Sequence, residues 1–206
     1  MVAKKEFYII KKDEYIKEEI KIKRSVFIAH LKHTETIEEA KNFISSISNQ
    51  YKDANHNCWA YIIGKEGEIF HSSDAGEPSG TAGKPMLNTL QKFKLTNVVS
   101  VVTRYFGGTK LGVRGLIDSY SEIVEKAILV TKLNKLVEVS EYKVLLDYDF
   151  FDTFQHNLKS IGVNIHNINY NDKITLNVLA EEKVDFELIK YLNELFQKNR
   201  IVFSKL

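Results

Sequence analysis

Glycine is concentrated in one stretch of this 206-residue chain. Nine of the ten glycines lie between Gly64 and Gly115, and both prolines, Pro78 and Pro85, lie in the same stretch. Glycine permits positive φ and lets the backbone approach other groups closely. Glycines that cluster among polar and charged residues indicate ordered loops with a binding role. A binding surface is therefore expected in this stretch.

Composition restricts the class of protein. The chain is 44% hydrophobic and 27% charged, which is ordinary for a globular protein. Its single cysteine, Cys58, excludes an intrachain disulfide and favours a reducing compartment. No apolar run is long enough to span a membrane, and no secretory signal follows the first residues. We expect a cytoplasmic protein without a membrane partner.

Charge is distributed unevenly along the chain. Residues 1–137 contain 21 basic and 16 acidic residues, a balance of +5, whereas residues 138–206 contain 8 and 11, a balance of −3. This asymmetry is consistent with a first half that faces a polyanion. A solvated lysine-rich surface is the alternative, and charge alone favours it.

Hydrophobic periodicity predicts an alternation of strands and helices in the first two thirds. The segment 98–102 is almost entirely apolar, which predicts a strand buried on both faces. Further strands are expected within 14–31, with residues 26–29 in the core, and at 58–63 and 68–70. Helices are expected at 37–47, 86–93 and 116–128.

The pattern changes after Asn134. Strands are expected at 142–146, 163–168, 174–178 and 201–203, and helices at 151–161 and 184–195. This βαββαβ order is that of a ferredoxin-like unit. We predict an α+β protein of two domains, 1–136 and 137–206, without a flexible linker.

The first glycine-rich run extends from Asp74 to Pro85. Its free N–H groups and small hydroxyls could form an anion nest before the helix at 86–93. The alternative is an Ω-type loop whose glycines serve only its turns. Asp74 and Glu77 do not suit a phosphate site, and they could instead orient Arg104 or Lys84, or accept hydrogen bonds from base or amide donors of a ligand.

The second run extends from Arg104 to Gly112, between a strand and a helix. Such a turn can present backbone N–H groups to an anion, and Arg104, Lys110 and Arg114 could add side-chain cations. A tight connection with exposed basic residues is the alternative. The spacing matches neither a Walker A loop nor a dinucleotide fingerprint.

Metal and nucleophile chemistry receive little support. His56, His71, Asp74 and Glu77 match no standard ligand spacing. A lone cysteine beside a tryptophan, as at Cys58, is usually buried rather than reactive. We predict no metal and no cofactor.

Three segments together resemble the YigZ/IMPACT family: 56–61 (HNCWAY), 76–83 (GEPSGTAG) and 104–112 (RYFGGTKLG). The resemblance covers the N-terminal two thirds, and the C-terminal unit is similar to the small domain that bacterial members append. It implies a first domain with the β/α fold shared by ribosomal-protein and translation-factor second domains, and a ferredoxin-like second domain. Eukaryotic relatives are associated with translational control, through competition for an activator of an initiation-factor kinase.

Two positions depart from the family pattern. Ala75 stands where the family usually has a second acidic residue, which weakens a paired-carboxylate mechanism. Arg114 replaces a common glycine, and Asp118 stands where bacterial members often have arginine. The basic charge is therefore displaced by about one helical turn.

We predict a translation-associated binding module whose partner is RNA, the ribosome or a translation-control protein. The alternative is an enzyme on a small anionic or nucleotide substrate, with Asp74 or Glu77 as general base and Arg104 as charge stabiliser. We expect one binding surface at the ends of the strands. Its predicted residues are His56, Asn57, Asp74, Gly76, Glu77, Ser79, Gly80, Thr81, Gly83, Lys84, Arg104, Tyr105, Gly107, Gly108, Lys110 and Arg114.

Overall fold

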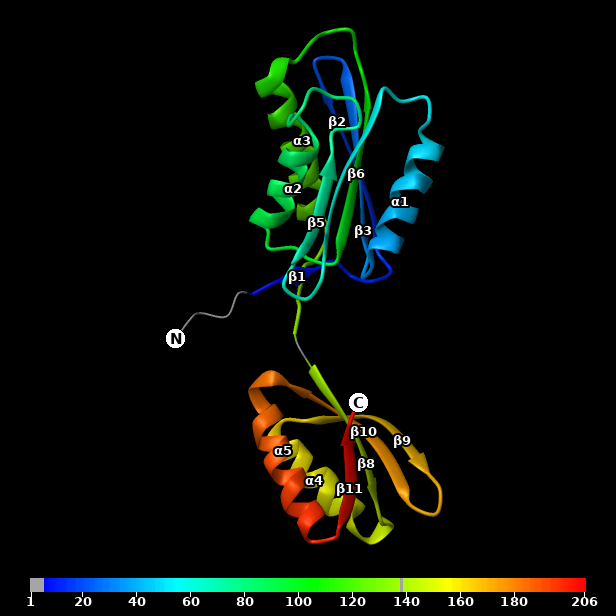
Figure 1. The fold of residues 1–206 in the computed structure, drawn as a ribbon, viewed down its shortest axis with the longest axis vertical. Helices are drawn as coiled ribbons and strands as arrows, with labels where there is room; N and C mark the ends of the chain where they lie inside the picture. The colour runs from blue at the N-terminus through cyan, green and yellow to red at the C-terminus, as the bar shows by residue number, and fades with distance from the viewer. Residues whose placement is uncertain (1–5, 138) are drawn as a thin grey trace. The chain divides into compact units, whose positions relative to one another are not determined.

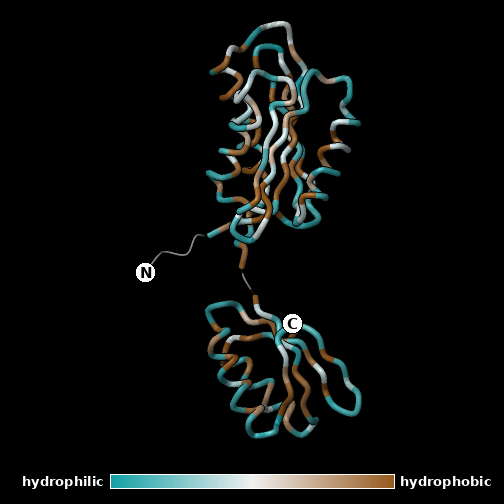
Figure 2. Tube along the Cα trace, in the orientation of Figure 1, coloured by the Kyte–Doolittle hydropathy of each residue, from teal (hydrophilic) through white to brown (hydrophobic). Residues whose placement is uncertain are grey.

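The structure, a computed structural model, describes residues 6–137 and 139–206. The chain divides into two compact units, Met1–Leu136 (unit 1) and Val137–Leu206 (unit 2), and each has its own sheet and core (Figure 1). Hydrophobic residues follow the strands of both units, while hydrophilic residues dominate the loops (Figure 2). The predicted α+β class is confirmed.

Unit 1 contains a five-stranded antiparallel sheet in the order β2-β3-β6-β4-β5. The strands are β2 (Tyr15–Ile22), β3 (Ser25–His33), β4 (His56–Ile63), β5 (Ile69–Ser73) and β6 (Val98–Tyr105). The central strand β6 is buried along its length up to Tyr105, as its apolar sequence predicts. Lys23 and Arg24, with φ of 45° and 71°, form the tight turn between β2 and β3.

Three helices cover the two faces of this sheet (Figure 1). α1 (Ile37–Gln50) packs on one face, and α2 (Gly83–Lys92) and α3 (Gly112–Leu129) pack on the other. Strand alternation divides the core, because successive side chains point to opposite faces. In β4, Cys58, Ala60 and Ile62 join the core beneath α2 and α3, whereas Tyr61 and Ile63 pack with residues of α1.

Periodicity missed one small pairing in unit 1. β1 (Tyr8–Ile9) and β7 (Asn134–Lys135) form a two-stranded antiparallel ladder. Backbone hydrogen bonds also join Tyr8 to Lys94 and to Thr96, each at 2.9 Å. Strands of two residues are too short to show alternation, so only the fold reveals them.

Unit 2 is a ferredoxin-like βαββαβ unit. Its antiparallel sheet has the order β11-β8-β10-β9, and α4 and α5 lie on one face (Figure 1). Gly162, with φ of 83°, ends α4 in the left-handed conformation that glycine adopts readily. The elements are β8 (Val139–Leu146), the 3-10 turn η1 (Tyr148–Phe150), α4 (Phe151–Ile161), β9 (Asn164–Tyr170), β10 (Ile174–Glu181), α5 (Glu182–Gln197) and β11 (Ile201–Lys205).

Most observed elements extend beyond the predicted ranges by a few residues, because polar ends of strands and helices carry no periodic signal. Among the described residues, no helix combines the length and the apolarity that a membrane crossing requires.

Candidate functional site

Three strands bring distant segments together at one end of the unit 1 sheet. Arg104, near the end of β6, lies opposite His56 at the start of β4 and opposite Phe27 near the start of β3. The loops after β5 and β6 begin at this same end. The two glycine-rich runs therefore meet here through sheet register rather than through sequence proximity.

A buried ion pair joins the two runs. Arg104 and Glu77 are 5% and 8% exposed, and the Arg104 guanidinium donates from Nη1 to Glu77 Oε1 at 2.5 Å. The Tyr120 hydroxyl of α3 donates to the same oxygen at 2.9 Å. His56 Nε2 lies 3.9 Å from Glu77 Oε2. His56, Glu77 and Arg104 thus converge on one cluster.

Arg104 is enclosed on its remaining sides. Its guanidinium lies 5.2 Å from the Phe27 ring centroid and 5.5 Å from that of Phe106. Nη2 donates to Ser25 Oγ at 3.4 Å, while Nε has no hydrogen-bond partner in the described part of the chain. Arg104 therefore holds loops together and is not a surface cation that could contact a phosphate directly.

The backbone N–H groups that were expected to bind an anion donate instead to a carboxylate of the same loop. The Asp74 carboxylate accepts hydrogen bonds from the backbone of Gly80 at 2.8 Å, Ala82 at 2.9 Å and Gly83 at 2.8 Å. Partial burial opposes the charge of Asp74, but these three donors lower the pKa of its carboxyl. A carboxylate held in this way closes the loop onto the start of α2 and is poorly suited to accept a proton.

Other groups that could act chemically are also engaged. The Cys58 thiol donates to the Asp74 carbonyl at 2.9 Å, and burial raises the pKa of this thiol to about 12, so it stays protonated. His56 Nδ1 donates to the Ala75 carbonyl at 3.0 Å. Together with the paired state of Glu77, these contacts give the enzyme hypothesis less support than the binding hypothesis.

Asn57 lies on the opposite face of the sheet, since it follows His56 directly in β4. Its side-chain oxygen accepts from the Thr103 hydroxyl at 2.7 Å, and its amide nitrogen donates to the Tyr51 carbonyl at 3.1 Å. Thr103 in turn lies 3.5 Å from the buried His30. The expected single surface is thus divided at this position, with Asn57 in a polar cluster beneath α1.

The remaining residues of the first run mainly stabilise the conformation of the loop. The Thr81 hydroxyl donates to the Pro78 carbonyl at 2.7 Å, and Ser79 is exposed. A Cβ at Gly76 would lie 3.3 Å from the His56 ring, and one at Gly83 would lie 2.7 Å from the Ser73 backbone. Gly83 therefore permits α2 to start in close contact with β5.

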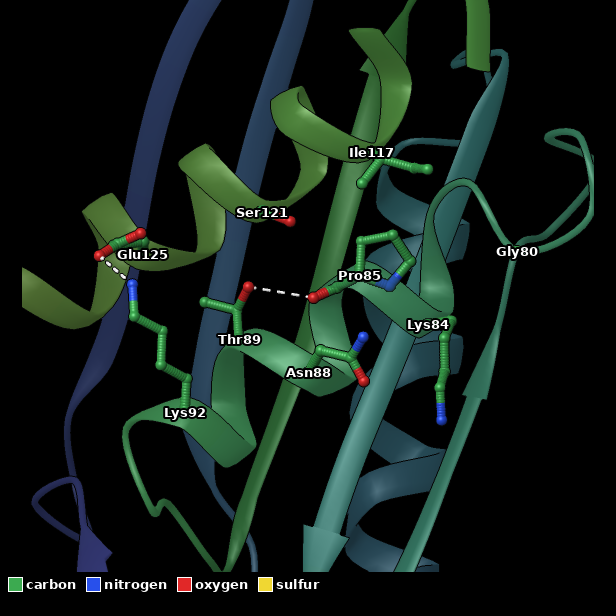
Figure 3. Close-up of a pocket in the computed structure, with 9 residues that line it drawn as sticks. All are labelled: Gly80, Lys84, Pro85, Asn88, Thr89, Lys92, Ile117, Ser121 and Glu125. Carbon is green, nitrogen blue, oxygen red and sulfur yellow. Dashed lines mark hydrogen bonds and ion pairs between the residues drawn. The ribbon is translucent and has the colours of Figure 1, made fainter. Parts of the chain in front are cut away.

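Lys84 and Gly80 line a groove of about 330 Å³ between α2 and α3 (Figure 3). Lys84 points outward from the first turn of α2, and Pro85 and Ile117 lie on the facing helices. An ion pair of 3.0 Å between Lys92 and Glu125 joins the two helices at the other end of the groove.

The second run forms an exposed loop. The Tyr105 hydroxyl donates to Asp53 at 3.1 Å, and the Gly107 amide donates to Ser25 Oγ at 3.2 Å. Gly108 adopts φ of 82°. Lys110 is exposed at the far end of this loop.

Arg114, in the first turn of α3, is also exposed. It forms an ion pair with Asp118 at 3.1 Å, so that much of its charge is offset within the helix.

Sequence reasoning missed four residues of this end. Lys23 and Arg24 occupy the β2–β3 turn. The sequence pattern predicts strands within residues 14–31, and a turn between two such strands could have been expected at these residues. Phe106, 44% exposed, lies within the second glycine-rich run, where glycines and cations give the stronger signal. Tyr120 belongs to the apolar face of a helix, and only the fold shows that its hydroxyl reaches Glu77.

Across residues 6–137 and 139–206, no three side chains among His, Cys, Asp and Glu gather in a way that could hold a metal ion.

Comparison with known proteins identifies relatives along most of the chain. Residues 23–128 match the Impact N-terminal domain. The chain is 37% identical over 182 residues to the IMPACT family member YvyE of Bacillus subtilis (strain 168), covering 86% of this chain and 82% of that protein. It is 35% identical over 159 residues to the IMPACT family member YigZ of Escherichia coli (strain K12), covering 76% and 78%.

A solved structure resembles the whole chain. The crystal structure of a hypothetical protein superposes with a TM-score of 0.66 at 29% sequence identity, and it covers 99% of this chain and 98% of its own. The similarity therefore includes both units.

Proposed function

This chain belongs to the IMPACT family, and from that premise we propose that it is a translation-associated binding module that contacts RNA through one end of unit 1. The family that the sequence motifs resemble includes eukaryotic relatives that are associated with translational control. The excess of basic residues in the first half of the chain is consistent with a polyanionic partner such as RNA or the ribosome, although charge alone does not select one.

The observation that carries this proposal is an exposed aromatic ring on a loop that lies against a basic turn. We define the basic tip as Lys23, Arg24, Phe106 and Lys110. All four residues are exposed, and Phe106 has 44% of its surface in solvent. Proteins that bind single strands without base-specific readout combine stacking aromatic rings with nearby cations in this way.

Backbone contacts fix the geometry of the basic tip. A Cβ at Gly107 would lie 2.1 Å from the Arg24 carbonyl carbon, so only glycine lets the loop lie against the β2–β3 turn. The Arg104 guanidinium contacts the Phe106 ring from within the fold, at 5.5 Å from the ring centroid. A nucleotide base could stack on the exposed part of the ring, supported from beneath by Arg104.

The test is binding of the full chain to a fluorescently labelled single-stranded RNA, measured as a function of salt. Each phosphate contact releases condensed counterions, so log affinity should fall with log salt by about 0.7 per contact. We expect Lys110→Ala to weaken binding and to reduce this slope by about one contact. Phe106→Ala should weaken binding by about 1–3 kcal/mol, the usual contribution of one stacked base, without changing the slope.

Lys65→Ala is the matched control, because Lys65 is exposed in the β4–β5 turn at the other end of the sheet. It removes the same charge, and we expect little change in binding. An equal loss in Lys65→Ala and Lys110→Ala would mean that RNA binds by net charge alone. No binding even at low salt would exclude RNA and leave a protein of the translation apparatus as the candidate partner.

A further inference from the structure

A second exposed aromatic surface lies on the other face of the unit 1 sheet, beside β2. α1 packs on residues of β4 and β6, among them Tyr61, Ile63 and Val99 (Figure 1). The β2–β3 half of the same face is open, and Tyr15, at the start of β2, has 48% of its surface in solvent. This half of the face is therefore accessible to a partner.

Sheet register shows which side chains share this face. His30 of β3 lies in one cross-strand row with Trp59 of β4, and Trp59 packs beside α1. Lys17 of β2 lies opposite His30 and belongs to the same row. Because side chains alternate along a strand, Tyr15 and Lys32, two residues further along β2 and β3, point to the α1 face as well.

Four rings form a continuous succession between β2 and α1. The Tyr15 ring centroid lies 6.2 Å from that of Phe43 and 6.1 Å from that of His30. The His30 ring centroid lies 4.9 Å from that of Tyr51. Phe43 and Tyr51 are partly exposed, whereas His30 is buried. We define the ring row as Tyr15, Phe43 and Tyr51.

Buried hydrogen bonds hold Tyr15 in place. Burial and the nearby Lys17 ammonium lower the pKa of His30 to about 4, so its ring is neutral at pH 7. The Thr103 hydroxyl donates to Asn57, and its oxygen is left to accept from His30 Nε2 at 3.5 Å. His30 Nδ1 then accepts from the Tyr15 hydroxyl at 2.6 Å. The exposed side of the Tyr15 ring is thereby preorganised for stacking.

Two ammonium groups border the ring row. Lys17 Nζ lies 5.6 Å from the Tyr51 ring centroid, and Lys32 Nζ lies 5.9 Å from that of Phe43. Both lysines are exposed, and neither forms an ion pair within the described part of the chain. Exposed rings with neighbouring cations are the arrangement with which proteins bind single-stranded nucleic acid.

The ring row is continuous with the basic tip. Lys17, Glu19 and Lys21 are exposed and alternate along β2 on this face, and the strand ends at the turn that carries Lys23. A strand rises about 3.4 Å per residue, so the distance along the chain from Tyr15 to Lys23 is about 25–30 Å. Among the alternating residues of β2 on this face, only Glu19 is acidic.

We propose that a single-stranded RNA segment lies along β2, from the basic tip to the ring row. This inference rests on the proposed function and specifies its ligand. Bases stack on Phe106 at one end and on Tyr15 at the other, and the phosphates between them contact Lys17 and Lys21. In a duplex the bases are already stacked on one another, so only an unpaired strand can engage both rings.

The first measurement concerns the length of RNA that the chain binds. The full chain is titrated at low salt with fluorescently labelled oligouridines: a dinucleotide, a tetranucleotide and an octanucleotide. A contact restricted to the basic tip would be nearly complete with the dinucleotide. We expect the octanucleotide to bind about tenfold more tightly or better, since it reaches the second stacking ring as well.

Tyr15→Leu removes that ring and should weaken octanucleotide binding about tenfold, the effect of one stacked base, without changing dinucleotide binding. Tyr15→Phe is the matched control. Both substitutions remove the hydroxyl that donates to His30, but only phenylalanine keeps the ring. Tyr15→Phe should therefore retain binding, whereas any loss caused by a rearranged His30 would appear in both variants.

A gain of affinity tests the path between the two rings. Glu19→Gln removes the exposed carboxylate on this face and should strengthen octanucleotide binding severalfold, because the phosphates are no longer repelled. Glu18→Gln removes the same charge from the neighbouring residue. Glu18 points to the other face, where it pairs with Lys126 of α3 at 2.9 Å, so its removal should leave binding nearly unchanged.

The outcomes separate this inference from the proposed function. Weaker binding by Phe106→Ala together with undiminished binding by Tyr15→Leu would overturn the path along β2 and leave the basic tip as the site. Equal gains in Glu18→Gln and Glu19→Gln would overturn the path as well, because net charge alone would explain them. An absence of RNA binding by the wild-type chain would overturn both proposals.

Discussion

The Glu77–Arg104 pair holds the two glycine-rich runs together at the level of single residues. Both side chains are almost fully buried, and Glu77 also accepts from Tyr120. The desolvation penalty of burying two charges offsets much of the free energy of their attraction. Removing only one partner is nevertheless strongly destabilising, because it leaves the other charge buried without a counter-charge. Its role here is to fix the loops that carry the basic tip.

The pair can be tested by removing one partner. Glu77→Ala leaves the Arg104 guanidinium buried without a counter-charge, and we expect a loss of about 3–5 kcal/mol in the free energy of unfolding. Asp118→Ala, which breaks only the exposed Arg114 pair, should cost about 0–1 kcal/mol. Urea denaturation of both variants measures the difference. Similar losses in the two would show that burial of the Glu77 pair is not what stabilises this end.

Asp74 gives a prediction for pH dependence. Its three N–H donors lower the folded-state pKa of the carboxyl below the ordinary value of 3.8. A depressed pKa contributes stability that is present above the unfolded-state value and is lost as pH falls through the folded-state value. The wild type should therefore be more stable than Asp74→Asn near pH 7, and this advantage should shrink below about pH 4. A stability difference that is constant across this range would contradict the assigned hydrogen bonds.

At the scale of elements, the loop after β6 depends on how closely it approaches the β2–β3 turn. The two backbones are in contact at Gly107, where any Cβ would overlap Arg24. The loop and the turn thus form one surface although β3 and β6 are far apart in sequence. Gly83 has the same role where α2 meets β5.

Gly107→Ala should separate the loop from the turn. We expect a loss of about 1–3 kcal/mol in stability, as is typical of an overpacked contact, and weaker RNA binding. Gly115→Ala provides the comparison, since a Cβ at residue 115 of α3 would lie 3.0 Å from the Cβ of Leu111, the residue before the helix. Alanine is favoured over glycine in a helix by about 0.5–1 kcal/mol, which should offset that crowding. Chemical denaturation and RNA titration of both variants measure these effects, and a neutral Gly107→Ala would contradict the close approach.

At the scale of the whole molecule, the chain consists of two units with separate cores and opposite charge balances. The basic tip and the buried ion pair both belong to unit 1. The proposed RNA contacts therefore all come from residues 1–136.

A fragment of residues 1–136 should fold and bind RNA at least as tightly as the full chain, because it lacks the net charge of −3 carried by residues 138–206. An NMR spectrum that overlays the unit 1 signals of the full chain, together with the RNA titration, tests this. A fragment that is unfolded, or that binds RNA much more weakly, would show that unit 2 contributes to the function.

The amino-acid sequence by itself determined the α+β class and the succession of the longer helices and strands, because hydrophobic periodicity is a local property. It also indicated the segments that matter, since clustered glycine marks backbone under constraint. It did not reveal that the Asp74 carboxylate accepts hydrogen bonds from the loop's own N–H groups, or that Arg104 is buried. Nor did it reveal that Asn57 lies on the other face of the sheet from His56. These facts depend on register and on contacts between distant residues, such as Glu77 with Tyr120 and Gly107 with Arg24. Only the tertiary structure decides them, because it alone determines which side chains share a face and which are left for solvent or a ligand.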